Sequence, residues 1–118
     1  MKHKITNYQS GHKAEIVAAE YLVAKGYKVI ELNWKTPVCE IDIIATLKNV
    51  MYFVEVKFRR TTNQGGGLEY ITDKKIAQMQ YAARCWVQAH KYSGDYELGA
   101  LEVSGENYQV TDFLPHIL

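Results

Sequence analysis

Two carboxylates and a lysine on neighbouring strand-like segments carry the strongest chemical signal in this sequence. Asp42 lies in the apolar run 40–45, and Glu55 and Lys57 lie in the run 51–58. Successive side chains of a strand point to opposite faces, so Glu55 and Lys57, two residues apart, share one face. The three side chains form one cluster when the two segments pair.

The polar break at 48–49 (Lys-Asn) sets the expected register of that pair. Asparagine tolerates the left-handed backbone that a tight hairpin requires, so a two-residue turn is predicted. Such a turn pairs Leu47 with Val50 and places Asp42 directly across from Glu55. Because cross-strand neighbours have Cβ atoms about 5 Å apart, the register predicts a compact acidic pair.

Glu40 extends the predicted cluster as a supporting residue. By strand alternation it shares the face of Asp42, opposite Ile41 and Ile43. The same register sets Glu40 across from Lys57.

A divalent cation explains why two carboxylates would face each other at a cost in stability. Mg²⁺ is typically held by one or two carboxylates, keeps several waters and completes its shell with phosphate oxygens of a substrate. A bound metal also eases formation of a hydroxide nucleophile. Lys57 suits the remaining task, because a nearby ammonium orients or deprotonates the water or stabilises the transition state. These residue types fit phosphodiester hydrolysis. The competing interpretation is a solvated strand face with alternating charges.

Glu15 is the fourth acidic candidate. It falls on the small, apolar side of the first expected helix, in line with Ala18 and Leu22, while Glu20 points to solvent. A carboxylate on a packing face is costly unless it is paired or binds a cation. Glu15 is therefore either a further metal or water ligand above the strand cluster, or a structural partner of an arginine or of Lys57.

The elements around these residues follow a mixed helical and strand pattern. Ser10 as N-cap and Gly26 as stop bound a first helix, and a second begins at Thr72 or Asp73 and runs to about His90. Strands are expected at about 27–34, 40–45, 51–58, 96–103 and 108–113. This order predicts one α/β domain over 1–118, with helices covering a mixed sheet.

A local basic patch is needed for any nucleic-acid contact, because the net charge is only +1. Arg59 and Arg60 end the third strand, and Lys74 and Lys75 begin the second helix beyond the glycine-rich stretch 61–67, an expected flexible loop near the site. These cations would hold a nucleic-acid backbone rather than read bases. Ordinary solvation is the alternative for the two lysines.

Other features exclude several classes. No apolar stretch approaches the roughly 20 residues that span a bilayer, and the basic start lacks the apolar block of a secretory signal. A cytoplasmic protein with no membrane partner is expected. Cys39 and Cys85 have no metal-binding spacing, which favours free thiols. Tyr81 and Trp86 on the second helix belong either to a dimer surface or to the core.

Asp42 followed by Glu55-Val56-Lys57 resembles the D…(D/E)-x-K signature of the restriction-endonuclease-like superfamily. The fuller pattern closely resembles the bacterial YraN family of small predicted endonucleases, which are similar to archaeal Holliday-junction resolvases. It comprises Gly11 to Glu15, Ala18 to Leu22, Gly26-Tyr27, Asn33, Glu40 to Ala45 and Phe53 to Lys57. Two departures are Cys39, where the family usually has glycine, and Lys35, where arginine is common.

The resemblance implies a three-layer fold with a mixed central sheet of about five strands. It implies that Asp42 and Glu55 bind Mg²⁺ or Mn²⁺ with help from the Val56 carbonyl, that Lys57 is the catalytic lysine, and that Glu15 is the acid contributed by a helix.

The activity implied by the resemblance is that of a metal-dependent endonuclease acting on DNA in preference to RNA, and an RNase on the same scaffold is an alternative that the sequence does not separate. Branched, Holliday-junction-like DNA is expected by analogy, and symmetric cutting of a junction usually needs a homodimer. The alternative class is a catalytically silent nucleic-acid-binding module or adaptor of a DNA-processing or ribosome-associated complex.

Overall fold

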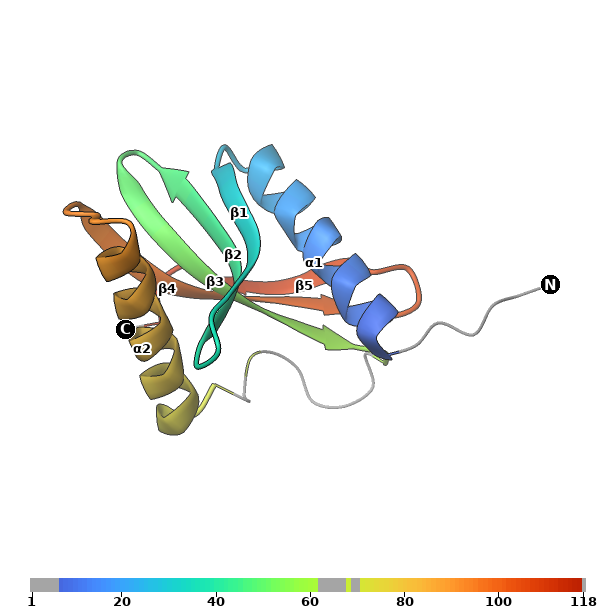
Figure 1. Ribbon diagram of the computed structural model, residues 1–118. Helices are drawn as coiled ribbons and strands as arrows, with labels where there is room; N and C mark the ends of the chain where they lie inside the picture. The colour runs from blue at the N-terminus through green and yellow to red at the C-terminus, as the bar shows by residue number, and fades with distance from the viewer. Residues whose placement is uncertain (1–6, 62–67, 69–70, 118) are drawn as a thin grey trace.

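Helical and strand patterns alternate along the chain in the computed structural model, which describes residues 7–61, 68 and 71–117 (Figure 1). The helices are α1 (Asn7–Ala24) and α2 (Asp73–Ala89). The strands are β1 (Lys28–Lys35), β2 (Glu40–Leu47), β3 (Val50–Arg59), β4 (Asp95–Ser104) and β5 (Gln109–Leu114).

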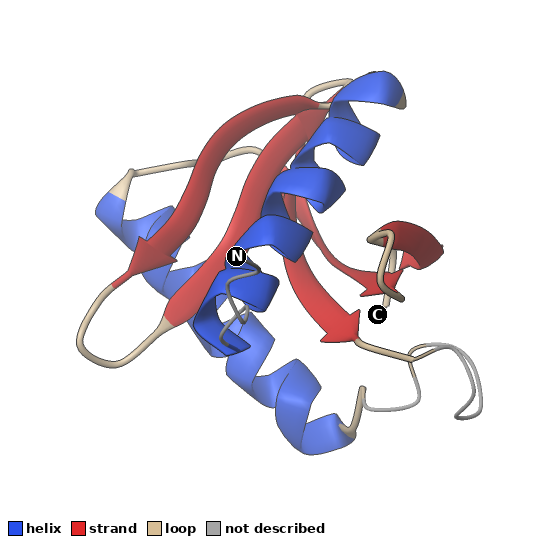
Figure 2. Cartoon of the chain, turned by 90° about the vertical axis from the view of Figure 1, so that its right-hand side faces the viewer, coloured by secondary structure: helices blue, strands red, loops and turns tan. Residues whose placement is uncertain are grey.

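The strands form one mixed sheet in the order β1-β2-β3-β4-β5. Only β3 and β4 are parallel among these neighbours, because parallel strands need a crossover and α2 supplies it. α1 packs on one face of the sheet and α2 on the other (Figure 1, Figure 2). The predicted α/β architecture with three layers is confirmed.

Two residues with left-handed backbone form the turn between β2 and β3, and this turn sets the register of the strands that carry the candidate site. Lys48 and Asn49 have φ of 51° and 68°, as a two-residue hairpin turn requires, and Leu47 pairs with Val50 as predicted. Gly26, with φ of 98°, ends the first helix. The local part of the predicted register is therefore confirmed.

The two helix starts differ in how well the sequence located them. α1 begins at Asn7, so Ser10 lies inside the helix and the predicted N-cap is wrong by three positions. Thr72 caps α2, where its Oγ1 accepts a hydrogen bond from the backbone N–H of Lys75 at 3.1 Å. This cap fixes the first turn of α2 and hence the place of Lys75.

Trp86 belongs to the core and not to a dimer surface, which corrects one of the two interpretations given to it. It is 5% exposed and meets Phe53 edge to face at 5.4 Å between ring centroids. Met79 and Ala83 of the same helical stripe are also buried. Tyr81 stays on the surface of α2 with 45% exposure.

Two further sequence expectations concern the remaining parts of the chain. Within the described residues, no helix is long and apolar enough to cross a membrane. The predicted glycine-rich loop falls largely on 62–67, which lies outside the described residues.

Leu22 offers a test of the packing between α1 and the sheet. Its side chain is fully buried, whereas the adjacent Val23 is 58% exposed. Leu22→Ala should lower the free energy of unfolding by about 2–5 kcal/mol, because it removes buried methyl groups and leaves a cavity. Val23→Ala, the matched control, should change it by no more than about 0.5 kcal/mol. Urea unfolding curves measure both, and equal losses would contradict this packing.

Candidate functional site

Asp42 lies where the pairing of two strands stops. The β2–β3 ladder ends at Ile43 and Val54. One residue further, Oδ2 of Asp42 accepts a hydrogen bond from the backbone N–H of Val56, with N···O at 2.8 Å. The carboxylate thus reaches β3 where the next backbone pair would form. The predicted strand pair between Asp42 and Glu55 is corrected accordingly: the two residues adjoin the end of the ladder without being a ladder pair.

Strand alternation breaks at the same place. Ile43 packs on the α1 side of the sheet, whereas Ile41 packs with Ile44 on the α2 side. The prediction that Ile41 and Ile43 share one face is therefore wrong. Asn33 of β1, which the register sets opposite Asp42, has a left-handed φ of 55°. Leu32 and Trp34 on either side of it also pack on opposite faces of the sheet, so β1 and β2 lose their alternation at the same level.

Glu40 pairs with Lys35 of β1, at the outer end of β2. The predicted position of Glu40 across from Lys57 is not reached, because the β2–β3 ladder has already ended. Glu40 is exposed and its negative charge raises the pKa of Asp42. Glu40 therefore lies beside the acidic cluster, but it pairs with β1 and not with β3 as predicted.

A cleft of about 750 Å³ lies between the β1–β2 connection and α2. Glu40, Asp42 and Glu55 line it from the strands, and Lys74 and Lys75 line it from the helix. Acidic and basic candidates from separate parts of the sequence thus share one concave surface. A cleft with this lining suits a ligand that carries both a metal ion and phosphate groups.

The Asp42 carboxyl is buried, with 8% exposure. Desolvation raises its pKa from 3.8 to about 7, and the negative charge of Glu55 adds to the rise. The hydrogen bond from Val56 opposes it, while Glu15 and Glu40 contribute smaller increases. Asp42 therefore gains or loses its proton near neutral pH, and a cation would favour the ionised form.

Glu15 lies on the packing side of α1, as predicted, and Glu20 is exposed. Burial raises the pKa of Glu15, while a hydrogen bond from Asn33 and the charge of His12 lower it. Its Oε2 is buried and has no hydrogen-bond partner among the described residues. An orphaned carboxylate oxygen inside a protein is costly, so it suits a cation or an ordered water.

Lys75 already neutralises one acid of the cluster. Its Nζ lies 3.1 Å from Oε1 of Glu55, and both side chains are about one-quarter to one-third exposed, at 33% and 22%. The sequence placed Lys75 among backbone-binding cations, whereas the structure brings it to a candidate metal ligand. Lys74, one residue earlier, is exposed at the same helix start.

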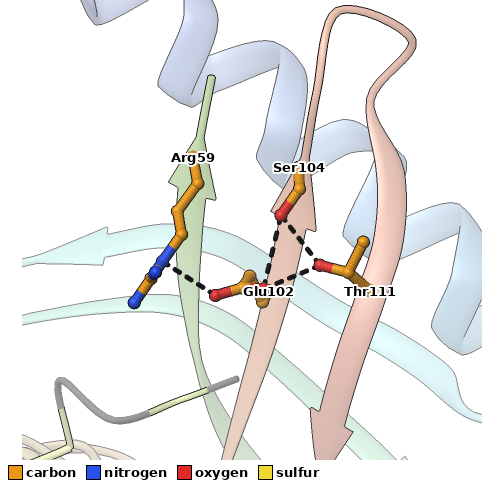
Figure 3. Close-up of polar contacts among 4 residues, drawn as sticks. All are labelled: Arg59, Glu102, Ser104 and Thr111. Carbon is orange, nitrogen blue, oxygen red and sulfur yellow. Dashed lines mark hydrogen bonds and ion pairs between the residues drawn. The ribbon is translucent and has the colours of Figure 1, made fainter. Parts of the chain in front are cut away.

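Lys57 and the two arginines continue along β3. Lys57 is exposed, shares the face of Glu55, and is in register with Glu102 of β4. Arg59 forms an ion pair with Glu102, with 3.0 Å between Nε and Oε2 (Figure 3). Arg60 is exposed just after the strand. The basic residues therefore divide between the cleft and the far end of β3.

The sequence profile of the uncharacterised protein family UPF0102 matches residues 14–105. The chain belongs to this family. The resemblance to the YraN family is thereby confirmed, since the two names denote the same group.

Relatives within UPF0102 are similar over most of their length. A UPF0102 protein of Cytophaga hutchinsonii is 33% identical over 102 residues, covering 86% of this chain and 90% of the relative. One from a Sulfurihydrogenibium species is 40% identical over 98 residues, covering 82% and 85%. One from Leifsonia xyli is 44% identical over 80 residues, covering 68% of each.

The UPF0102 match includes a residue that sequence reasoning missed. Glu102 lies within it, between the buried Leu101 and Val103. A carboxylate within the otherwise small and apolar run 98–103 was the available signal. The role of Glu102 depends on the parallel pairing of β4 with β3 across the α2 crossover, and the sequence does not reveal that pairing.

The donor set can be compared with what a metal requires. Among the described residues, no three acidic, histidine or cysteine side chains form a ready-made metal site. Asp42 and Glu55 line one cleft. The orphaned oxygen of Glu15 belongs to α1, on the other face of the sheet from α2, and the charge of Glu15 raises the pKa of Asp42. Two carboxylates fit Mg²⁺ or Mn²⁺ whose shell is completed by water and substrate phosphate, rather than a closed protein cage.

Proposed function

We propose that this UPF0102 chain is a metal-dependent endonuclease that hydrolyses phosphodiester bonds in DNA, with branched, Holliday-junction-like DNA as its substrate class. The observation that carries the proposal is the buried Asp42 carboxylate, placed beside Glu55 in a cleft lined by two lysines. Burying an acid next to another acid destabilises the fold, so a cationic ligand supplies the physical reason for this arrangement.

Each side chain has a defined role in the proposed reaction. Asp42 and Glu55 would hold Mg²⁺ or Mn²⁺, with the Val56 carbonyl and the orphaned oxygen of Glu15 as further donors. The metal, when bound, supplies Lewis-acid stabilisation of the phosphoryl group and an activated water. Lys57 would orient or deprotonate the attacking water, or neutralise charge on the phosphate in the transition state.

Substrate binding falls to the cations around the cleft. Lys74 and Lys75 at the start of α2, with Arg59 and Arg60 at the end of β3, attract the phosphate backbone. Contacts of this kind position nucleic acid without reading its sequence. The branched substrate and a two-fold homodimer are proposed by analogy with junction resolvases, which must cut two strands symmetrically.

Cleavage of a panel of labelled nucleic acids tests this function. Four-way junction, flap, duplex and single-stranded DNA, and RNA, are incubated with the protein and Mn²⁺ or Mg²⁺. We expect junction cleavage that stops with EDTA and falls at least about 100-fold in Asp42→Ala, because a metal ligand is lost. Asp95→Ala, at an exposed position at the start of β4, should cut normally.

Two outcomes would redirect the interpretation. Preferred cleavage of RNA or of single strands would keep the nuclease and replace its substrate. A folded protein that cuts nothing and is not stabilised by Mn²⁺ would contradict the hydrolase and favour the silent adaptor.

A further inference from the structure

The ends of β3, β4 and β5 hold a second polar cluster, formed by Arg59, Glu102, Ser104 and Thr111 (Figure 3). Glu102 is its centre, and the side chain is only 4% exposed. The cluster lies on the sheet face that carries Lys57, because Lys57 and Glu102 are register partners in parallel strands.

One oxygen of Glu102 is held by hydroxyl groups. Thr111 Oγ1 donates a hydrogen bond to Oε1 of Glu102 at 2.8 Å. Ser104 Oγ lies 2.8 Å from Thr111 Oγ1 and 3.3 Å from the same Oε1. Since Ser104 has one hydroxyl proton, the shorter distance favours a relay from Ser104 to Thr111 to Glu102. The relay restricts the rotamer of Glu102.

The other oxygen of Glu102 faces Arg59. Oε2 lies 3.0 Å from Nε, yet it lacks a hydrogen-bond partner of acceptable angle among the described residues. The contact is therefore ionic rather than a well-aligned hydrogen bond. The Arg59 side chain keeps 22% exposure, so its guanidinium is held from within and remains accessible to solvent.

A buried ion pair is weak evidence for stability, because desolvation offsets its attraction. Conformational specificity is the better-founded use of such a pair, and here the side chain that is fixed is an arginine. A guanidinium is planar and matches a phosphate with two parallel donors, so its orientation matters for binding. Arg59 follows Lys57 at the next position on the same strand face, about 6.8 Å along β3.

We propose that Glu102, braced by Thr111 and Ser104, is a positioning residue that fixes Arg59 as a phosphate clamp for the nucleic-acid backbone. The clamped phosphate lies one same-face step beyond Lys57, so the bound strand runs along β3 and away from the cleft. This inference rests on the proposed function and adds the path of the substrate to it.

DNA affinity over a series of salt concentrations tests the clamp. Fluorescence anisotropy with a labelled four-way junction in EDTA measures binding without cleavage. Arg59→Ala should weaken binding about tenfold and reduce the salt slope by about one phosphate contact. Arg59→Lys should restore the slope but not the full affinity, because lysine lacks the two-pronged geometry.

Glu102→Gln gives the decisive measurement. Removal of a negative charge near DNA should tighten binding if only electrostatics acts, and Glu106→Gln in the exposed β4–β5 turn provides that control. The clamp instead requires Glu102→Gln to weaken binding about threefold or more. The loss should vanish in the Arg59→Ala background, because Glu102 acts through Arg59.

Thr111→Val keeps the charge of Glu102 and removes the hydroxyl that donates to it. This variant therefore tests the clamp if Glu102→Gln fails to fold. Unchanged or tighter binding in a folded Glu102→Gln or Thr111→Val variant would overturn the clamp while leaving the nuclease intact. A wild-type protein that binds no nucleic acid would overturn both.

Discussion

Replacing Lys57 with alanine is expected to lower the cleavage rate by about 10²–10⁴-fold, the usual contribution of a general acid–base or charge-stabilising group. The side chain shares the strand face of Glu55 but is exposed, so its removal leaves the core intact. Single-turnover cleavage of the preferred substrate measures the loss. Lys28→Ala, also exposed and at the start of β1, should cut at the wild-type rate.

The role of Lys57 is separable from metal binding. Stabilisation by Mn²⁺ should persist in Lys57→Ala, because the carboxylates that would hold the ion remain. If that stabilisation disappears as well, the lysine acts through the metal site instead of on the reacting phosphate. A rate loss below tenfold would assign Lys57 to an ordinary solvated strand face.

Lys75 is the rival for the same task. Its Nζ is 3.1 Å from Glu55, inside the cleft, whereas Lys57 lies on β3, on the strand face of Glu55. Because Glu55 is a candidate metal ligand, the Lys75 ammonium must move away from Glu55 or share it when a metal ion binds. The same single-turnover assay on Lys75→Ala ranks the two lysines, and the proposed mechanism requires the larger loss at Lys57.

Local sequence was enough to locate the β2–β3 hairpin. The Lys-Asn turn at 48–49 adopts left-handed backbone, so Leu47 meets Val50 and the acids come to the same end of the strands. Nothing beyond the turn type and the strand period was needed. That is why the sequence alone predicts that Asp42 and Glu55 lie close together.

Non-local contacts account for what the sequence did not reveal. Three features depend on segments that are separated in the chain. They are the left-handed backbone of Asn33 opposite β2, the ion pair of Lys75 with Glu55, and the burial of Glu102. Parallel pairing of β3 with β4 depends on the length and path of the α2 crossover, which no short pattern encodes. The places where strand pairing ends and the partners of charged residues are consequently the features that only the three-dimensional structure shows.

Asp42→Asn is expected to stabilise the metal-free protein above pH 7. Burial and the neighbouring acids raise the pKa of Asp42 from 3.8 to about 7. Between these values the folded chain keeps a proton that the unfolded chain has lost, so wild-type stability falls as pH rises through about 4 to 7. Ionising Asp42 in the fold costs at most about 4 kcal/mol, and asparagine avoids that cost.

Urea unfolding at pH 5, 6, 7 and 8 in EDTA measures the difference between the two proteins. The advantage of the variant should grow from about 1–2 kcal/mol at pH 5 to about 4 kcal/mol at pH 8, because the unfolded wild type is already ionised at pH 5. Asp95→Asn, exposed at the start of β4, should follow the wild-type profile. Parallel profiles for Asp42→Asn and the wild type would show that Asp42 titrates normally.

Addition of Mn²⁺ should reverse the order at pH 8. A metal binds only the ionised carboxylate, so it competes with the proton and stabilises the wild type increasingly from pH 6 to 8. Asparagine has lost the negative charge and should gain little. Stabilisation by metal that is equal in both proteins would place the ion elsewhere, and the cost of burying Asp42 would then lack the cationic ligand proposed to explain it.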